Sequence, residues 1–411
     1  MPNATDSHRD EAHRILAETP LIDGHNDLPF QYRKRVGNRL DGIDLAADTA
    51  TLVPTMHTDI ARLRRGRVGA QFWALYLPSS IEGPGAARAL FEQIDVTHRM
   101  IERYSEVFEH ATSAADIERI FATGKIASVL AIEGGYAIEN SLAVLRQAYR
   151  CGARYMTLTH NDNTNWADSA TDEPRHGGLA DFGREVVREM NRLGMIVDLS
   201  HAAPSTMHDA IDTSEAPVLF SHSNARALCD HPRNVPDDVL ARLREVGGMV
   251  MATFVPPFIS KDARHHRRGA EAERQRLKAD VGAGEAADSL PQDKVADVDS
   301  QMDAWLEANP APRATLEQVA DHIDYLRDAV GIDGVGIGSD FDGITMVPVG
   351  LEDVSTYPAL IAELLRRGYS AEDVGKVAGR NLLRLMREVA SAGIEIAAAR
   401  PPSDVLFEGL A

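Results

Sequence analysis

The sequence predicts an α/β fold, a (β/α)8 TIM barrel with insertions, from three observations. Short apolar runs alternate with helical segments, and eight such runs follow one another along the chain. Most of these runs are continuously apolar, which is typical of parallel strands covered on both faces. The chain has 411 residues, whereas a TIM barrel needs about 250, so the barrel must carry insertions.

The candidate strands are residues 21–27, 68–77, 126–135, 155–160, 195–201, 216–223, 247–255 and 334–343. Three segments between them carry clear helix signals. Residues 179–194 end in glycine, residues 236–248 begin with proline and aspartate, and residues 315–331 begin with a threonine that can cap a helix. This alternation predicts parallel strands joined by crossover helices.

A charged segment at about 261–312 interrupts the pattern between the seventh and eighth strands. It is rich in charged residues, so we expect a solvated helical insertion rather than a catalytic element. The sequence "HHRR" at 265–268 could bind a metal, although a surface patch is the simpler interpretation. No internal repeat or linker is evident, which predicts a single domain over residues 1–411.

Composition restricts the partners and the location. The formal charge of -19 disfavours nucleic acid or an anionic membrane as a partner. Cys151 and Cys229 are the only cysteines, which fits a reducing compartment and excludes a cysteine-based zinc module. The N-terminus lacks the apolar core of a signal peptide, no apolar run could span a bilayer, and the C-terminus lacks a lipid-anchor tail. We therefore expect a cytoplasmic protein without a membrane anchor.

Polar residues stand at the ends of several candidate strands. In "LIDGHNDLP", His25 and Asp27 lie two residues apart on a strand, so their side chains point to the same side. Four later strands end in Glu133, in His201, in His222, and in the pair Asp340 and Asp342. The C-terminal ends of barrel strands meet at one rim, where active sites are built. Turns, helix caps or core histidines could explain each residue singly, but one shared ligand explains them together.

The residue types indicate a divalent metal. Imidazoles and carboxylates without thiolates suit Zn²⁺ or a neighbouring ion. One arrangement has two ions sharing Glu133, with His25 and Asp27 on one ion and His201 and His222 on the other. Paired ions of this kind deprotonate a water that attacks a carbonyl or phosphoryl centre. Asp340 would then be free to carry the proton to the leaving group.

Six motifs in order resemble the membrane dipeptidase (renal dipeptidase) family of the amidohydrolase superfamily: "LIDGHNDLP", "LAIEGG", "LTHNDNTNWADS", "VDLSH", "FSHSNARALCDHPRNVPDD" and "GIGSDFDG". The match runs from about residue 20 to "GRNLLRLM" near 379–386 and omits only the ends and the charged insertion. The resemblance implies an amidohydrolase-like barrel with two zinc ions that hydrolyses dipeptides, often with a D-residue at the C-terminal position. It also suggests a homodimer. The best-known members are secreted and lipid-anchored, and this chain shows neither signal.

The resemblance also assigns roles by matching motif. His25 and Asp27 bind one zinc, His201 and His222 bind the other, and Glu133 bridges them. Asp340 matches the general acid/base. His160 matches the histidine that polarises the substrate carbonyl and supports the oxyanion, and Arg233 matches the arginine that holds the free carboxylate of the substrate.

These expectations describe a binuclear zinc dipeptidase that hydrolyses dipeptides with a free C-terminal carboxylate, including L-Xaa-D-Xaa, by a hydroxide bridging the metals. Two alternatives stay open. A related barrel could hydrolyse N-acyl amino acids, lactams or phosphoesters, because the ion pair itself is indifferent to the leaving group. The second alternative is a metal-binding or scaffold protein without catalysis. Asp340 and His160 argue against it, because a protein that only binds a metal does not need a free proton carrier.

Overall fold

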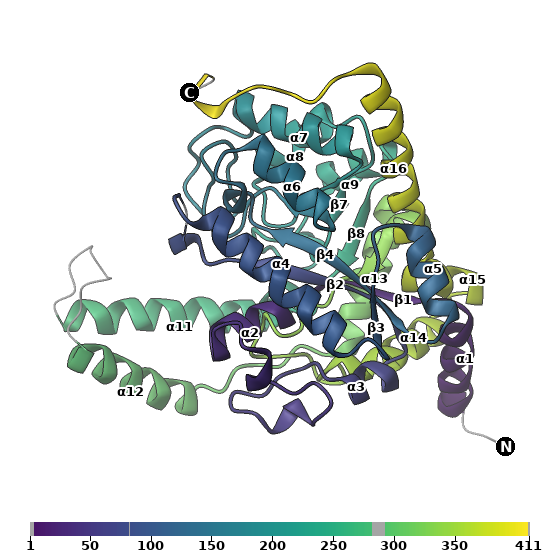
Figure 1. Cartoon of the computed structure of the whole chain (residues 1–411). Helices are drawn as coiled ribbons and strands as arrows, with labels where there is room; N and C mark the ends of the chain where they lie inside the picture. Colours follow the sequence, from purple (N-terminus) through teal and green to yellow (C-terminus); the bar gives the residue numbers. More distant parts are fainter. Residues whose placement is uncertain (1–3, 82, 282–291, 410–411) are drawn as a thin grey trace.

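The computed structural model describes residues 4–81, 83–281 and 292–409. A ring of strands lies at the centre, and helices surround it (Figure 1). The strands are β1 (Leu21–Asn26), β2 (Val68–Tyr76), β3 (Phe108–His110), β4 (Ile126–Glu133), β5 (Ala153–Thr157), β6 (Ile196–Asp198), β7 (Leu219–Phe220), β8 (Met249–Ala252) and β9 (Val335–Ile337).

Eight of these strands close a parallel barrel. Hydrogen-bonded neighbours follow the order β2-β1-β9-β8-β7-β6-β5-β4, and β2 also pairs with β4. The short strand β3 was not predicted from the sequence. It pairs with the first residues of β4, and β5 pairs with the later residues of β4. The register aligns Tyr76 with Glu133, Glu133 with Thr157, and Thr157 with Asp198, so these strand ends form one layer of the rim. The predicted (β/α)8 barrel is confirmed.

Several strands are shorter than predicted. β7 covers only Leu219–Phe220 and β9 only Val335–Ile337, because the polar residues that follow each strand leave the ladder and turn toward the rim. After β9, Asp340 and Asp342 adopt φ angles of 70° and 65°, which no β-strand accommodates. Strand β5 begins two residues before the predicted range of 155–160.

The helices are α1 (Ala4–Glu18), α2 (Leu28–Val36), α3 (Ile60–Arg65), α4 (Ala86–Arg103), α5 (Ala114–Ala122), α6 (Leu142–Arg150), α7 (Asp181–Leu193), α8 (Pro204–Thr213), α9 (Asp237–Glu245), α10 (Pro256–Ile259), α11 (Lys261–Asp280), α12 (Gln292–Ala308), α13 (Leu316–Val330), α14 (Tyr357–Arg366), α15 (Ala371–Gly375) and α16 (Asn381–Ala399). The three helices predicted from caps are α7, α9 and α13. In α13 the Thr315 hydroxyl accepts the Gln318 N–H, and the Gln318 side chain accepts the Thr315 N–H. Every helix in the described ranges is too short or too polar to cross a bilayer.

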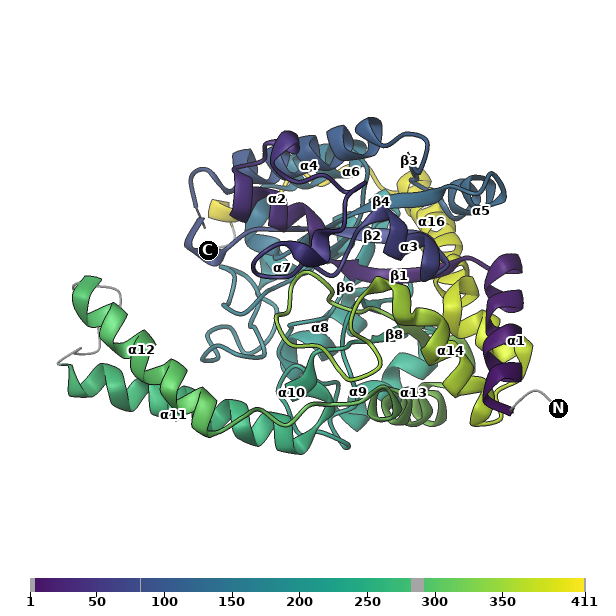
Figure 2. The ribbon, with the colours of Figure 1, turned by 90° about the horizontal axis from the view of Figure 1, so that it is seen from below.

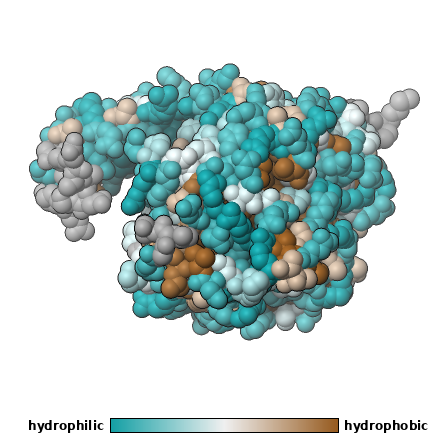
Figure 3. Space-filling view, turned by 90° about the horizontal axis from the view of Figure 1, so that it is seen from above, coloured by the Kyte–Doolittle hydropathy of each residue, from teal (hydrophilic) through white to brown (hydrophobic). Residues whose placement is uncertain are grey.

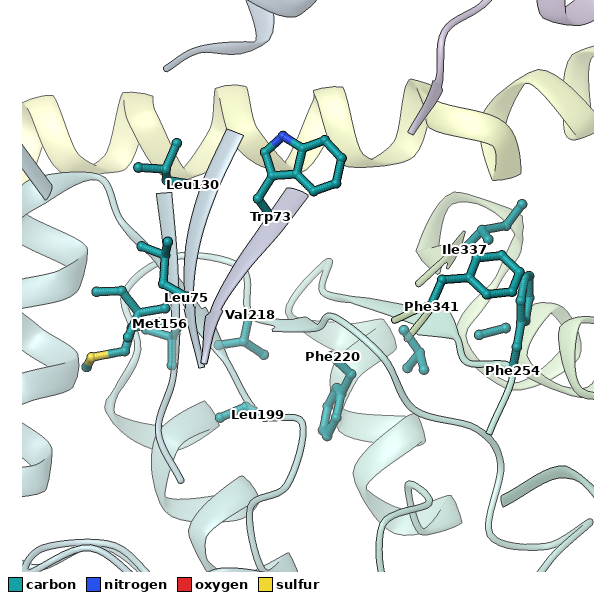
Figure 4. Packing of buried hydrophobic residues seen from close by; sticks show 14 of the residues in the cluster. Trp73, Leu75, Leu130, Met156, Leu199, Val218, Phe220, Phe254, Ile337 and Phe341 are labelled. Carbon is teal, nitrogen blue, oxygen red and sulfur yellow. The ribbon is translucent and has the colours of Figure 1, made fainter. Parts of the chain in front are cut away.

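Apolar side chains from neighbouring strands fill the core (Figure 4). Phe341 is fully buried, and its ring centroid lies 5.5 Å from that of Phe254. Burying such a ring contributes about 1.5–3 kcal/mol. Phe341 therefore anchors the segment that follows β9 and fixes the position of the carboxylates on either side of it.

The charged insertion was predicted as a solvated helical segment, and in the residues that the structure describes it forms a pair of helices, the inserted hairpin. Helices α11 and α12 lie side by side and extend away from the barrel (Figures 1 and 2). Among its described residues, Leu277, Val298 and Met302 form the buried core, and the surface of the two helices is mostly hydrophilic (Figure 3). Residues 282–291 of the predicted insertion lie outside the described ranges.

Candidate active site

Glu133, at the end of β4, lies at the centre of the rim and is 3% exposed. Four imidazole rings face its carboxylate. From Oε1, the Nε2 atoms of His201, His222 and His160 lie at 3.1, 3.6 and 3.7 Å, and from Oε2 the Nε2 of His25 lies at 3.5 Å. The barrel thus brings together residues from strand ends far apart in the sequence.

Two further carboxylates lie beside His25. The Nε2 atom of His25 is 3.5 Å from Oδ2 of Asp27, and ligand atoms of His25, Asp27 and Asp340 lie within 4.8 Å of one another. Gly343 permits this close approach. A Cβ at this position would lie 2.2 Å from Asp27 Oδ2 and 2.4 Å from Asp340 Oδ1, so any side chain here would displace a carboxylate.

Left-handed backbone conformations occur at the site. His201 has a φ of 69°, close to the values at Asp340 and Asp342. Non-glycine residues in this region cost about 1–3 kcal/mol each and cluster at functional sites. Asp342 serves this local structure: its Oδ1 accepts the backbone N–H of His57 at 2.7 Å, and its own N–H donates to His57 Nδ1. None of the described groups that could hold a metal includes Asp342.

Tyr155 determines which nitrogen of His25 carries the proton. The tyrosine hydroxyl donates to the carbonyl oxygen of Gly24 at 3.0 Å, so it must accept its other hydrogen bond, at 2.9 Å, from His25 Nδ1. In neutral His25 the Nε2 atom therefore carries no proton, and its lone pair points at the carboxylates of Asp27 and Glu133.

A similar chain orients His222. The Ser221 hydroxyl donates to Oδ2 of Asp198 at 2.7 Å and accepts from His222 Nδ1 at 2.8 Å. The lone pair of His222 Nε2 then faces His201 Nε2 at 2.9 Å. Tyr155, Ser221 and Asp198 were not predicted. Outer partners of this kind orient metal-binding histidines, but mid-strand aromatics and small polar residues in a sequence are typical of ordinary core positions.

These donors fit a metal. His25 Nε2 is buried and has no hydrogen-bond partner among the described residues, although it faces two carboxylates, and a cation between them would satisfy all three groups. Burial lowers the pKa of His25, but the Tyr155 hydroxyl and the charges of Glu133 and Asp27 outweigh it and raise that pKa well above its usual value. A proton and a metal therefore compete for this nitrogen.

The other ligand candidates are held in their metal-binding forms. Burial keeps the pKa of His201 and His222 well below the usual value, and the positive charges of Arg233 beside His201 and of His25 beside His222 lower each pKa further, so both rings are neutral. Burial would raise the pKa of Glu133, but the positive charge of His25 and the hydrogen bond from His201 lower it well below its usual value. Nitrogen and oxygen donors without sulfur suit Zn²⁺ and related ions.

Asp340 differs from Glu133 in its electrostatics. Burial and the neighbouring charge of Asp27 raise the pKa of Asp340 well above the ordinary range. Two carboxyl groups at one site, one driven toward ionisation and the other toward protonation, are typical of divided roles in acid–base catalysis. Asp340 is therefore the carboxyl group at this rim that is best suited to hold a proton.

Arg233 is a buried cation on the same rim, with 2% of its surface exposed. Its guanidinium donates weakly to Ser223 Oγ at 3.4 Å and to the His222 carbonyl at 3.3 Å, and its Nε has no hydrogen-bond partner in the described chain. The guanidinium also lies 5.3 Å from the ring centroid of Phe258. Burial lowers the pKa of Arg233 to about 10, so it stays cationic at neutral pH with unused hydrogen-bonding capacity.

A cavity of about 370 Å³ joins these groups. Its wall includes Asp27, Glu133, His160, His201, Arg233 and Asp340. The two remaining predicted residues, His25 and His222, lie directly behind Glu133. All eight predicted site residues therefore lie at one end of the barrel. The histidines of "HHRR" do not join this cluster: His266 bonds to the carbonyl of Asn309 at 2.7 Å, and no described metal-type group includes His265 or His266.

The hydrogen bond from His25 to Tyr155 yields a prediction. Tyr155→Phe keeps the ring, which stacks on Phe72, but removes the acceptor that holds the His25 tautomer. We expect metal affinity to fall about 10- to 100-fold, measured by zinc titration against a competing chelator. Ser221→Ala, at the other histidine, should give a loss of similar size. Unchanged zinc affinity in both variants would contradict the proposed orienting role.

A parallel barrel whose rim gathers histidines and carboxylates around one glutamate defines a metal-dependent hydrolase of the amidohydrolase type. More specifically, the chain belongs to the membrane dipeptidase family (peptidase family M19), whose model matches residues 9–400, and it is a metallo-dipeptidase. The dipeptidase verJ of Clonostachys rogersoniana is 38% identical over 402 residues, which is 95% of this chain and 89% of that protein.

Solved structures agree. The probable dipeptidase PvdM of Pseudomonas aeruginosa superposes with a TM-score of 0.79 at 26% identity, covering 95% of this chain and all of that one. A metallo-peptidase of Rhodobacter sphaeroides, bound to a phosphinate mimic of the dipeptide L-Ala-D-Ala, superposes with a TM-score of 0.70 at 27% identity. The superposition covers 90% of this chain and 99% of the Rhodobacter sphaeroides chain.

Proposed function

We propose that this chain is a binuclear zinc dipeptidase whose substrates carry a free C-terminal carboxylate, including L-Xaa-D-Xaa dipeptides. One observation carries the proposal: a buried arginine with free hydrogen-bonding capacity shares a 370 Å³ cavity with a cluster of metal-type ligands and a carboxyl group of raised pKa. Together these parts can bind a substrate carboxylate, activate a metal-bound water and carry a proton to the leaving amine.

His25 and Asp27 would hold one zinc, His201 and His222 the other, and Glu133 would bridge them. When bound, such a pair of ions supplies a deprotonated water and polarises the scissile carbonyl. The orphaned lone pair of His25 and the neutral state of His201 and His222 support this assignment.

Arg233 would bind the substrate carboxylate and fix the register of the peptide. An arginine fork binds a carboxylate through two parallel hydrogen bonds, and a buried site strengthens the contact. The weak hydrogen bonds that Arg233 makes to Ser223 and His222 leave its other donors available.

Asp340 would carry the proton, and His160 would stabilise the negative charge that develops on the carbonyl oxygen. Asp340 Oδ lies close to Asp27 and His25, and its raised pKa suits a group that takes a proton and then delivers it to the departing amine. His160 lines the cavity beside Glu133, at 3.7 Å, and can donate from its ring.

The Rhodobacter sphaeroides relative supports the stereochemical part of the proposal, because its bound inhibitor mimics L-Ala-D-Ala. The cytoplasmic location and the homodimer stay predictions.

The first experiment is hydrolysis of matched L-Xaa-L-Xaa and L-Xaa-D-Xaa dipeptides by the zinc-reconstituted protein, with the C-terminal amide of each beside it. Cleavage of the free acids in both series, but not of the amides, is the expected result. If no dipeptide is cleaved while two zinc ions are bound, the substrate belongs to the alternative class of N-acyl amino acids or lactams.

Arg233→Gln tests the clamp directly. It removes a buried charge that would pair with the substrate, so we expect kcat/KM for the free-acid dipeptides to fall about 100-fold or more. Zinc content should not change, because Arg233 is not among the ligand candidates. A variant that keeps the wild-type preference for free acids over amides would show that another group recognises the carboxylate.

A further inference from the structure

A second, larger cavity opens directly from the catalytic one. Its volume is about 700 Å³, and we call it the outer chamber. Four residues line both cavities and form the junction between them: Asn161, Arg233, Phe258 and Arg267. Because Arg233 is at this junction, whatever is bound to Arg233 lies at the entrance to the outer chamber.

The inserted hairpin builds one wall of the outer chamber. Although most of the hairpin extends away from the barrel (Figure 2), the first three turns of α11 lie at the rim and contribute Arg264, Arg267, Arg268 and Glu271 to this wall. The charged insertion, which the hydrolytic chemistry does not use, is therefore part of the route to the active site.

Arg267 is available to a ligand. Its Nε donates to Glu271 Oε1 at 2.9 Å, one turn along the same helix, and the two side chains are 59% and 62% exposed. Exposed pairs of this kind contribute little to stability, so an incoming anion can replace Glu271 at small cost.

Another part of the wall of the outer chamber is acidic and carries Asp162, Asp172 and Glu173. Asp172 is already engaged, because its oxygens accept the backbone N–H groups of Asn163 and Glu173 at 2.8 Å each. None of these carboxylates lines the catalytic cavity. The charged residues of the junction itself are both cationic.

We infer that the junction at the entrance to the outer chamber is a subsite for an acidic side chain on the C-terminal residue of the substrate. This inference rests on the proposed function, in which Arg233 binds the α-carboxylate. The side chain of that residue then starts at the junction, where Arg267 also lines both cavities and can bind the carboxylate of an aspartate or glutamate. Dipeptides that end in an acidic residue would engage both junction arginines.

The test compares substrates that differ only in charge. Ala-Glu and Ala-Gln have side chains of the same size and shape, and Ala-Lys reports on the acidic wall. Each is assayed with an L- and a D-residue at the C-terminal position. We expect kcat/KM for the better Ala-Glu isomer to exceed that for the matched Ala-Gln about tenfold, and this ratio should fall as salt is added.

Arg267→Gln should bring the Glu/Gln ratio close to one. Arg274→Gln is the matched control, because Arg274 lies two turns along α11, pairs with Asp299 of α12 at 2.8 Å, and lines neither cavity. It should keep the wild-type ratio. An equal rate for Ala-Glu and Ala-Gln, a preference for Ala-Lys, or a ratio that survives in Arg267→Gln would each overturn the subsite. Failure of the proposed function is distinct, because then the wild-type protein would cleave none of these dipeptides.

Discussion

Asp340→Asn is expected to keep its metal and lose turnover, with kcat lower by a factor of about 10² to 10⁴. The amide has nearly the shape of the carboxyl group but cannot take up a proton from the attacking water or deliver one to the leaving amine. Asp340 is well placed for this transfer, because it lies beside Asp27 and His25, and burial together with the charge of Asp27 raises its pKa.

Zinc content and kcat must be measured on the same preparation, since a loss of metal would also abolish activity. Asp342→Asn is the matched control. Asp342 lies two residues away and serves mainly to hold His57, so it should show a much smaller loss of kcat. If Asp340→Asn keeps most of its turnover, or if it loses zinc in proportion to activity, Asp340 is not the proton carrier.

The barrel could be predicted from the sequence because its strands are buried on both faces. Continuous apolar runs such as the one in β4 have few alternative explanations in a chain of this length. The strand ends could not be predicted to the residue. β7 and β9 end where polar side chains turn into the rim, and left-handed backbone at His201 and Asp340 depends on tertiary contacts that a sequence does not display. Strand β3 is three residues long and has no distinctive pattern.

The clustering of the candidate site residues could be predicted from their positions at the strand ends. His, Asp and Glu residues at the ends of apolar strands are costly without a ligand, so they stand out in the sequence. Their partners do not stand out. Tyr155 lies 130 residues from His25, and Asp198 reaches the His222 ring through Ser221. These residues contact the site histidines only because the closed barrel brings their strands together.

The insertion was predicted as a solvated helical segment, and composition supports no more than that. A run of charged residues does not specify which turn of a helix meets the body of the protein. Arg267 lines the catalytic cavity, whereas Arg274, seven residues later on the same helix, pairs with α12. The difference depends on where α11 leaves the rim.

Glu133→Gln is expected to lose both metals and more than about 10³-fold in activity, because in the proposed arrangement it removes the one negative charge that the two metal ions share. Its two oxygens lie 3.1–3.7 Å from four imidazole nitrogens. Glutamine keeps the shape but replaces one oxygen with an NH₂ group, which cannot bind a metal.

Thermal unfolding with and without zinc separates this effect from a loss of activity alone. With free zinc at 1,000 times its Kd, each occupied site should stabilise the wild-type protein by about 4 kcal/mol, and Glu133→Gln should lack this zinc-dependent rise in Tm. Glu139→Gln is the matched control, because Glu139 accepts backbone N–H groups of Gly85 and Ala87 outside the cavity and should keep the zinc response. If Glu133→Gln still binds two zinc ions and is stabilised by them, the ions do not share this carboxylate, and His25 with Asp27 and His201 with His222 must hold them separately.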